Sequence, residues 1–256
     1  MMNLKGMDVL AKHVPELNST SGRVRIFLYF AFCVLLVTGY FVVSDNIPTW
    51  SVDSQILIIA LGFLIIRFYF MSKTSYQKKY GELAYRNAFA HYMIPGLAFM
   101  LSAVGHAAYM NGPFIPRGWW TVAFTLLGWL MLLVGIPLAL RSLFTFGADN
   151  IALLYVYYPE EGKIIESSIY GVLRHPVYAG ILRIMIGLAL LNGNANSIVA
   201  ALFVPLGFFG FVRLVEEMEL IERFGSSYLD YRKRVPAFWP KLRDLGTFYK
   251  FLLTGR

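Results

Sequence analysis

Residues 118–140 read GWWTVAFTLLGWLMLLVGIPLAL and contain no charged side chain. A helix needs about 20 apolar residues to cross a bilayer, so this stretch predicts a membrane-spanning helix. Five further apolar runs cover residues 25–43, 55–71, 88–110, 178–191 and 197–212. The polar turn NGNAN at residues 192–196 separates the last two runs and predicts a helical hairpin. The chain is therefore expected to be an all-α, polytopic membrane bundle with about six transmembrane helices.

The composition excludes most soluble classes of protein. Hydrophobic residues make up 57% of the chain and charged residues only 15%, against about 25% charged in a soluble domain. A soluble dehydrogenase and a soluble nucleic-acid binder are both disfavoured. The net charge of +8 instead indicates basic loops that face anionic membrane lipids, with no nucleic acid as partner. Cys33 is the single cysteine, so no internal disulfide is possible.

The basic residues predict how the chain is oriented. When successive loops are assigned to alternate sides, 20 of the 23 Lys and Arg residues fall on one side and one on the other. Arg67 and Arg183 lie inside predicted spans. Positive charge accumulates on the cytoplasmic side, which predicts cytoplasmic N- and C-termini and a cytoplasmic C-terminal helix. We expect the inner or plasma membrane in a bacterium, or the endoplasmic reticulum in a eukaryote.

The segment YGVLRHPVYAG at residues 170–180 precedes the fifth predicted span. Pro176 suits the first turn of a helix because it has no N–H to leave unpaired. His175 would then lie beside the exposed N–H groups of a helix N-terminus, where an anionic group can bind. Arg174 adds a positive charge. The plainer interpretation is an interfacial arginine followed by a proline that starts a helix.

An acidic cluster, RLVEEMELIERFG at residues 213–225, follows the sixth predicted span. Glu217 lies four residues after Arg213, so the two are expected on one helix face. A solvated helix that ends at Gly225, with Arg213 snorkelling, would account for the outer glutamates. It accounts less well for Glu216 and Glu217, because acidic side chains beside the lipid boundary need a partner.

The last motif, YLDYRKRVPAFWP, covers residues 228–240. Tyr228 and Tyr231 are three residues apart and are expected on one helix face. The basic run at residues 232–234 suits lipid headgroups. Phe238 and Trp239 suit an interfacial aromatic belt.

Taken in this order and spacing, the motifs between residues 170 and 240 resemble the isoprenylcysteine carboxyl methyltransferase and phospholipid methyltransferase superfamily. The sequence departs from the family pattern at Ser168 and Ile169, where Gly-Pro is frequent. The resemblance implies a membrane-embedded enzyme that uses S-adenosylmethionine, with a cytoplasm-facing cofactor pocket and a lipophilic acceptor. It also implies a methyltransferase core at residues 141–256, made of a loop, the two-helix hairpin and the cytoplasmic helix. Residues 1–140 would form N-terminal transmembrane helices without an assigned role.

The resemblance also implies roles for individual residues. The expected cofactor-binding residues are Tyr170, His175, Pro176, Tyr178, Gly180, Glu216, Glu217, Tyr228 and Tyr231. Arg213 is expected to face a carboxylate or phosphate of the acceptor. Arg174, beside the helix start, can bind the carboxylate of the cofactor. These two arginines are the predicted catalytic residues, and no metal is predicted.

The chemistry leaves the acceptor open between a prenylated cysteine carboxylate, a lipid headgroup amine and a thiol. A carboxylate needs only orientation, whereas an amine or a thiol needs a group to take its proton, such as His175 or a glutamate. Two other kinds of function remain as alternatives. An NADPH-dependent reductase of the sterol and steroid type carries a related Arg-His-Pro pattern, and a transporter or scaffold would show broken helices and charges at mid-membrane. For Arg183, both an interfacial position and a second substrate anchor are open.

Overall fold

The structure, a computed structural model, describes residues 5–47 and 49–255. These residues are largely helical and contain no β-strand beyond one isolated bridge between Phe114 and Asn194. The six longer helices are α2 (Thr20–Ser44), α3 (Trp50–Tyr80), α5 (Ile94–His106), α6 (Trp119–Phe146), α8 (Pro176–Asn192) and α9 (Ala195–Phe211). The shorter helices are α1 (Met7–His13), α4 (Ala84–Ala88), α7 (Ala148–Ile151), α10 (Glu217–Phe224), α11 (Ser226–Arg234) and α12 (Leu245–Thr254). Two π-helical segments are η3 (Phe89–Met93) and η7 (Val212–Glu216).

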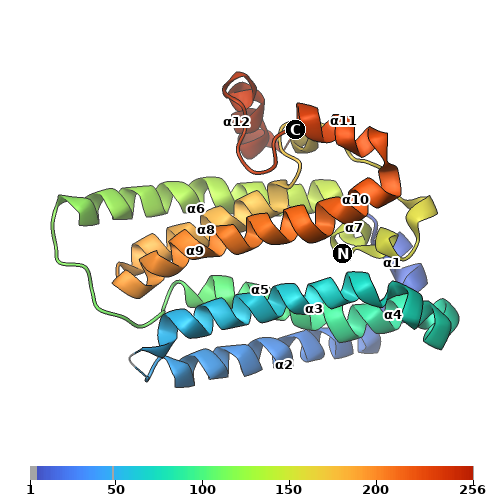
Figure 1. The fold of residues 1–256 in the computed structure, drawn as a ribbon, viewed down its shortest axis with the longest axis horizontal. Coiled ribbons are helices and arrows are strands. Elements are labelled where there is room, and N and C mark those ends of the chain that lie inside the picture. Colours follow the sequence, from blue (N-terminus) through green and yellow to red (C-terminus); the bar gives the residue numbers. More distant parts are fainter. Residues whose placement is uncertain (1–4, 48, 256) are drawn as a thin grey trace.

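The long helices form two packed groups that run alongside each other (Figure 1). Helices α2, α3 and α5 make one group, and α6, α8 and α9 make the other. Contacts of α3 with α9 and of α5 with α8 join the two groups. The first and last described helices, α1 and α12, both lie nearer the end of the bundle where α6 ends than the end where α6 begins.

Within the part of the chain that the structure describes, five helical segments are long and apolar enough to cross a membrane. They are Thr20–Ser44, Trp50–Met71, Lys73–His106, Trp119–Phe146 and Ala195–Phe224. Helix α8 is apolar but has only 17 residues, which is the lower limit for a crossing. Large apolar side chains such as Leu35 and Leu133 are exposed on the outside of the bundle, where only lipid would cover them. The all-α, multi-pass membrane fold is thus confirmed, and the cytoplasmic assignment of the shared end stays a prediction.

The sixth predicted span does not end before the acidic cluster. Helix α9 continues through η7 into α10, so that Ala195–Phe224 is one helical rod of 30 residues. The π turn inserts an extra residue and changes which side chains share a face. Consequently Arg213 is exposed while Glu217 is buried, and the expected common face of these two residues is wrong.

Glycines allow α8 to lie directly against α6. A Cβ atom added at Gly180 would stand 2.5 Å from the backbone nitrogen of Ala139, and one at Gly135 would stand 2.9 Å from the carbonyl oxygen of Gly180. Gly187 approaches the carbonyl oxygen of Gly128 in the same way. Small residues permit such close backbone approach between membrane helices. This seam fixes α8, which begins at the proline of the Arg-His-Pro motif.

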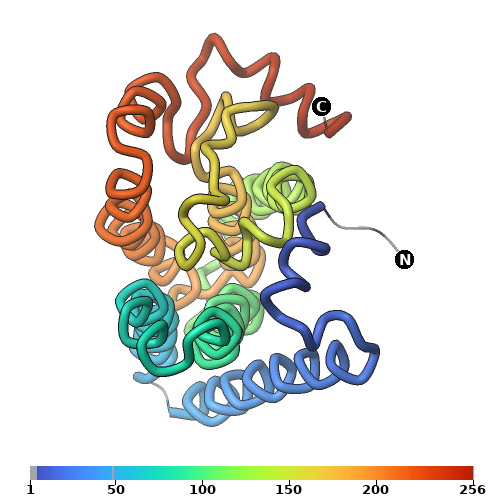
Figure 2. Tube along the Cα trace, turned by 90° about the vertical axis from the view of Figure 1, so that its right-hand side faces the viewer, coloured from blue at the N-terminus to red at the C-terminus, as the bar shows by residue number. Residues whose placement is uncertain are grey.

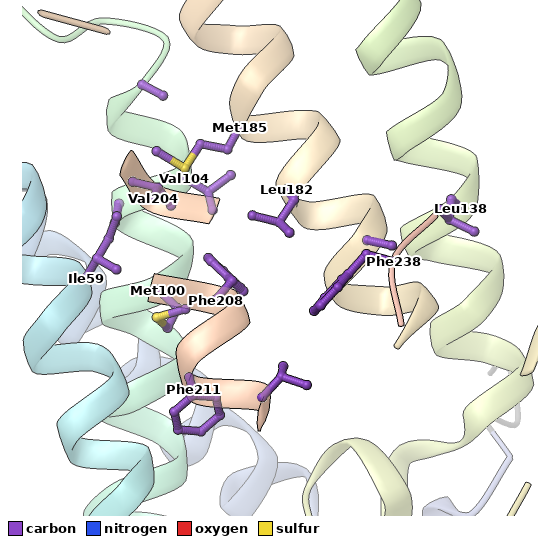
Figure 3. Packing of buried hydrophobic residues seen from close by; sticks show 14 of the residues in the cluster. Ile59, Met100, Val104, Leu138, Leu182, Met185, Val204, Phe208, Phe211 and Phe238 are labelled. Atoms are coloured by element: carbon purple, nitrogen blue, oxygen red, sulfur yellow. The ribbon is translucent and has the colours of Figure 1, made fainter. Parts of the chain in front are cut away.

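The chain returns into the bundle after α11. Phe238 is only 4% exposed and belongs to the main apolar cluster, together with Leu182 of α8 and Leu138 of α6 (Figure 3). The expected interfacial position of Phe238 is therefore wrong. Arg183 holds this segment, because its guanidinium donates to the Phe238 carbonyl oxygen at 3.2 Å and lies 4.2 Å from the Trp239 ring. The contacts with Phe238 and Trp239 explain why Arg183 is buried, without an interfacial position or a bound substrate.

Residues 147–171 cross the end of the bundle between the N-terminal segment and the α10–α11 region (Figure 2). A second apolar cluster anchors this connection through Leu154, Val156 and Tyr157, which pack with Tyr69 and Tyr85 of the N-terminal half. The Tyr69 hydroxyl donates to the Leu153 carbonyl oxygen at 2.7 Å, and the Tyr85 hydroxyl donates to the Ala152 carbonyl oxygen at 3.1 Å. Residues 147–171 are thus fixed in place beside the N-terminal ends of α8 and α10.

Candidate functional site

The Arg-His-Pro motif starts α8 as expected, with Pro176 in the first turn and His175 at the N-cap. The loop before it is fixed by the returning C-terminal segment. The backbone N–H groups of Arg174 and His175 donate to the carbonyl oxygens of Pro236 and Ala237, at 2.9 and 3.1 Å. The Arg174 guanidinium also donates to the carbonyl oxygens of Arg232 and Val235. Residues about sixty positions apart in sequence therefore meet here.

Glu217 is the centre of a buried ion cluster. Its Oε1 accepts hydrogen bonds from Nε and Nη2 of Arg174 at 3.0 and 2.7 Å, and lies 3.2 Å from Nε2 of His175. Its Oε2 lies 3.2 Å from Nε of Arg232. The Glu217 side chain is 3% exposed. A carboxylate this deeply buried needs such partners, so Glu217 ties the Arg174 loop to α10 and α11.

Glu216 has fewer partners than the adjacent Glu217. Its Oε1 lies 3.4 Å from Nδ1 of His175, whereas its Oε2 is buried without a hydrogen-bond partner. Burial alone would lower the pKa of His175, but the carboxylates of Glu216 and Glu217 outweigh burial and raise that pKa above its usual value. Both ring nitrogens of His175 face carboxylate oxygens, an arrangement that suits the protonated imidazolium.

A cavity lies between the Arg174 loop, the crossing connection and α10–α11. It contains about 690 Å³ of space between atoms, including its mouth, and Arg174, His175 and Glu216 form part of its wall. Tyr170, Tyr228 and Tyr231 complete the polar side of this cavity.

The three tyrosines hold their places in different ways. The Tyr231 hydroxyl donates to the Tyr170 carbonyl oxygen at 2.6 Å, and the Tyr170 ring stacks on Phe146. The Tyr228 hydroxyl is buried without a hydrogen-bond partner. Burial raises the pKa of Tyr228, so its hydroxyl keeps its proton at neutral pH. Tyr228 and Glu216 thus place an unpaired donor and an unpaired acceptor at one cavity, and unpaired buried polar atoms are rare without a ligand.

Comparison with known proteins points to one group of enzymes. The phospholipid methyltransferase family model matches residues 123–227. Protein-S-isoprenylcysteine O-methyltransferase B of Arabidopsis thaliana is 28% identical over 59% of this chain and 74% of that relative. The A enzyme of the same plant is 26% identical over 72% of this chain and 91% of its own length, and the Saccharomyces cerevisiae enzyme is 27% identical over 71% and 77%. No solved structure matches the chain.

These matches support the resemblance of the chain to the isoprenylcysteine carboxyl methyltransferase and phospholipid methyltransferase superfamily. The chain is a multi-pass membrane protein and a methyltransferase. The relatives give no support to the reductase, transporter or scaffold alternatives. The family match includes both the Arg-His-Pro motif and the acidic cluster, which the structure brings to one cavity.

Some of the predicted site residues line the cavity and others do not. The residues that line the cavity are Tyr170, Arg174, His175, Glu216, Tyr228 and Tyr231. Five others do not line it, although they lie in the same region or on the same helical rod: Arg213, Pro176, Tyr178, Gly180 and Glu217. Gly180 packs on α6, and the Tyr178 ring stacks beside His175 at 6.0 Å. The Arg213 side chain is exposed in η7.

The methyltransferase cavity also contains residues that the sequence analysis did not single out. Phe70 comes from α3, Asn150 and Lys163 come from the crossing connection, and Glu219 and Arg223 come from α10. Glu219 is one of the outer glutamates that the sequence analysis assigns to a solvated helix, and Arg223 has no role there. Their spacing from Glu216, by three and seven residues, is the helical signal that could have identified them. Nothing local in the sequence indicates that Phe70 or Lys163 reaches this cavity.

Proposed function

We propose that this protein transfers the methyl group of S-adenosylmethionine to the carboxylate of a prenylated cysteine. The sulfur–methyl bond breaks as the oxygen–methyl bond forms, and the products are S-adenosylhomocysteine and a methyl ester, with no proton released. The observation that supports this proposal most is the polar cavity between the Arg174 loop and α10, in a chain whose relatives are named protein-S-isoprenylcysteine O-methyltransferases.

The residues present fit the cofactor. S-adenosylmethionine carries an amino group, a carboxylate and ribose hydroxyls, and supplies an electrophilic methyl group when bound. The free Oε2 of Glu216 offers an acceptor to the amino group or to a ribose hydroxyl. The Tyr228 hydroxyl offers a further donor and acceptor. His175 and Tyr231 close the wall around them.

Glu217 has a different role in this proposal. Its two oxygens are occupied by Arg174, His175 and Arg232, and it does not line the cavity. Glu217 is therefore a positioning residue that keeps the Arg174 loop against α10. Of the two glutamates that the motif offers, Glu216 is the one that would touch the cofactor.

The state of the site favours a carboxylate over an amine as the acceptor. An amine would need a base to take its proton, but both nitrogens of His175 face carboxylates, and the free oxygen of Glu216 is assigned to the cofactor. A carboxylate is already ionised at neutral pH and needs only alignment and exclusion of water. The buried walls of the cavity serve both needs. Arg174 is already bound to Glu217, so we assign it to shaping the wall.

The proposal extends to orientation and to domain roles. Basic residues gather at the end of the bundle that carries the cavity, so the cavity opens to the cytoplasm, where S-adenosylmethionine is available. Residues 141–256 form the methyltransferase core. The N-terminal helices add a wall through Phe70 and anchor the connection through Tyr69 and Tyr85.

Calorimetry on the purified full chain in detergent tests the cofactor. S-adenosylhomocysteine should bind, and NADPH should not. A second assay follows transfer of a labelled methyl group from S-adenosylmethionine to N-acetyl-S-farnesylcysteine. Binding of NADPH alone would refute the proposal. Methylation of phosphatidylethanolamine without methylation of the farnesylcysteine would refute the carboxylate acceptor.

A further inference from the structure

A second hollow lies beside the cofactor cavity, and we call it the α3–α10 groove. Its walls are residues 67–74 of α3, residues 156–160 of the connection and residues 214–223 of the η7–α10 segment. It contains about 1950 Å³ of space, including its wide mouth. Met71, Leu214 and Met218 line it and are more than half exposed. The groove thus lies where two membrane-spanning segments end, and it presents exposed apolar side chains.

The groove and the cofactor cavity share a wall. Phe70, Val156, Glu219 and Arg223 line both hollows. Two of these four carry charge, although the wall is largely buried: the Glu219 side chain is 20% exposed and that of Arg223 is 12% exposed. They pair with each other at 2.9 Å along one face of α10. Since burying an ion pair gives little net stability, a pair in this wall calls for another explanation.

Arg223 retains an unused donor. Its Nη2 donates to Glu219, whereas its Nε is buried and has no hydrogen-bond partner. A Cβ atom at Gly162 would stand 2.9 Å from Nη1, so the connection passes directly over the Arg223 guanidinium. The guanidinium is planar and directs its N–H groups in a fixed fork, which suits a carboxylate or phosphate. An anionic group at the junction of the two hollows would satisfy this donor.

We propose that Arg223 binds the anionic head of the acceptor at this junction, while the α3–α10 groove takes the acceptor's hydrocarbon chain. This inference rests on the proposed methyltransferase function. The groove offers apolar side chains to the chain of a lipid, and the shared wall brings the head next to the cofactor cavity.

Charge alone does not select the anion, because the groove is lined by Arg67 and Lys73 on α3 and by Glu160 and Glu222 opposite. The preference for an anion comes from the unpaired Nε–H of Arg223, a donor that would otherwise stay buried without an acceptor. A neutral amide head would use this donor less well, since hydrogen bonds to charged groups are about twice as strong.

The test compares an acid with its amide, so that only the head changes. Binding of N-acetyl-S-farnesylcysteine and of its carboxamide is measured on the full chain in detergent with S-adenosylhomocysteine present. For the wild type we expect the acid to bind at least about tenfold more tightly, as one charged hydrogen bond provides. In Arg223→Gln this preference should fall to about threefold or less, and Arg223→Lys should restore it in part.

Two further measurements make the result specific. The Tm of Arg223→Gln should stay within a few degrees of the wild type, which shows that the variant is folded, and its Kd for S-adenosylhomocysteine is measured alongside. Arg243→Gln is the matched control, because Arg243 is exposed and lines neither hollow. An unchanged preference for the acid, or a loss of cofactor affinity without a change in that preference, would overturn the role of Arg223. Failure of the wild type to transfer methyl groups would instead count against the proposed function, since the binding comparison does not need turnover.

Discussion

The two adjacent glutamates should fail in different ways when each is changed to glutamine. Glu217 is buried between Arg174, His175 and Arg232, and the exchange removes the charge that compensates them. Breaking a buried ion pair from one side costs about 3–5 kcal/mol. At about 2–4 °C per kcal/mol for a chain of this size, Glu217→Gln should lower Tm by roughly 6–20 °C.

Glu216 should affect binding more than folding. Its only close ionic contact is the 3.4 Å approach to Nδ1 of His175, and its Oε2 is free. A hydrogen bond from the cofactor to this charged oxygen is worth about 1.5–3 kcal/mol, so Glu216→Gln should weaken S-adenosylhomocysteine binding by roughly 10- to 150-fold. Its Tm should stay within a few degrees of the wild type.

Thermal unfolding and calorimetry in one detergent measure both effects. Asp230→Asn is the control, because Asp230 lies on the exposed face of α11 and pairs only with the exposed Lys233. Should Glu217→Gln keep the wild-type Tm, the ion cluster does not hold the Arg174 loop. Should Glu216→Gln bind S-adenosylhomocysteine as the wild type does, the free oxygen does not touch the cofactor.

Three other perturbations test the supports of the site. The pKa of His175 is raised in the folded state. The protonated His175 therefore contributes fully to stability below its unfolded pKa of about 6.5, and this contribution is lost as pH rises through its folded pKa. Tm should fall over this pH range, and the same fall of Tm with pH in His175→Gln would contradict the assignment. Gly180→Ala places a Cβ atom 2.5 Å from the backbone of α6 and should cost about 1–3 kcal/mol, whereas Gly210→Ala meets no atom within 4 Å and should not destabilise; equal Tm values for the two would refute the α6–α8 seam. Arg183→Gln should free the segment around Phe238, so trypsin should cleave at Lys241 faster than in the wild type, and an unchanged rate would show that Arg183 is not its anchor.

The sequence by itself determined the class of fold and the identity of the motifs. Runs such as residues 118–140 can bury their backbone only as helices in lipid, so hydropathy alone indicates the spans. The Arg-His-Pro motif and the paired glutamates were recognised from residue type and spacing. Their meeting was expected from the topology, and the structure brings Arg174, His175 and Glu216 to one cavity, whereas Glu217 binds Arg174 outside the cavity lining.

Only the tertiary structure decided which of these residues reach the cavity. A π turn between α9 and α10 changes the helical phase, so that Glu217 turns inward to Arg174 and Arg213 turns outward. The burial of Phe238 against His175 depends on a chain segment more than sixty residues away. Hydropathy and residue spacing describe each segment by itself, in contact with water or lipid but not with the other segments. Helical phase, and contacts between distant segments, are set by packing, and packing decides which polar groups stay unpaired and therefore open to a ligand.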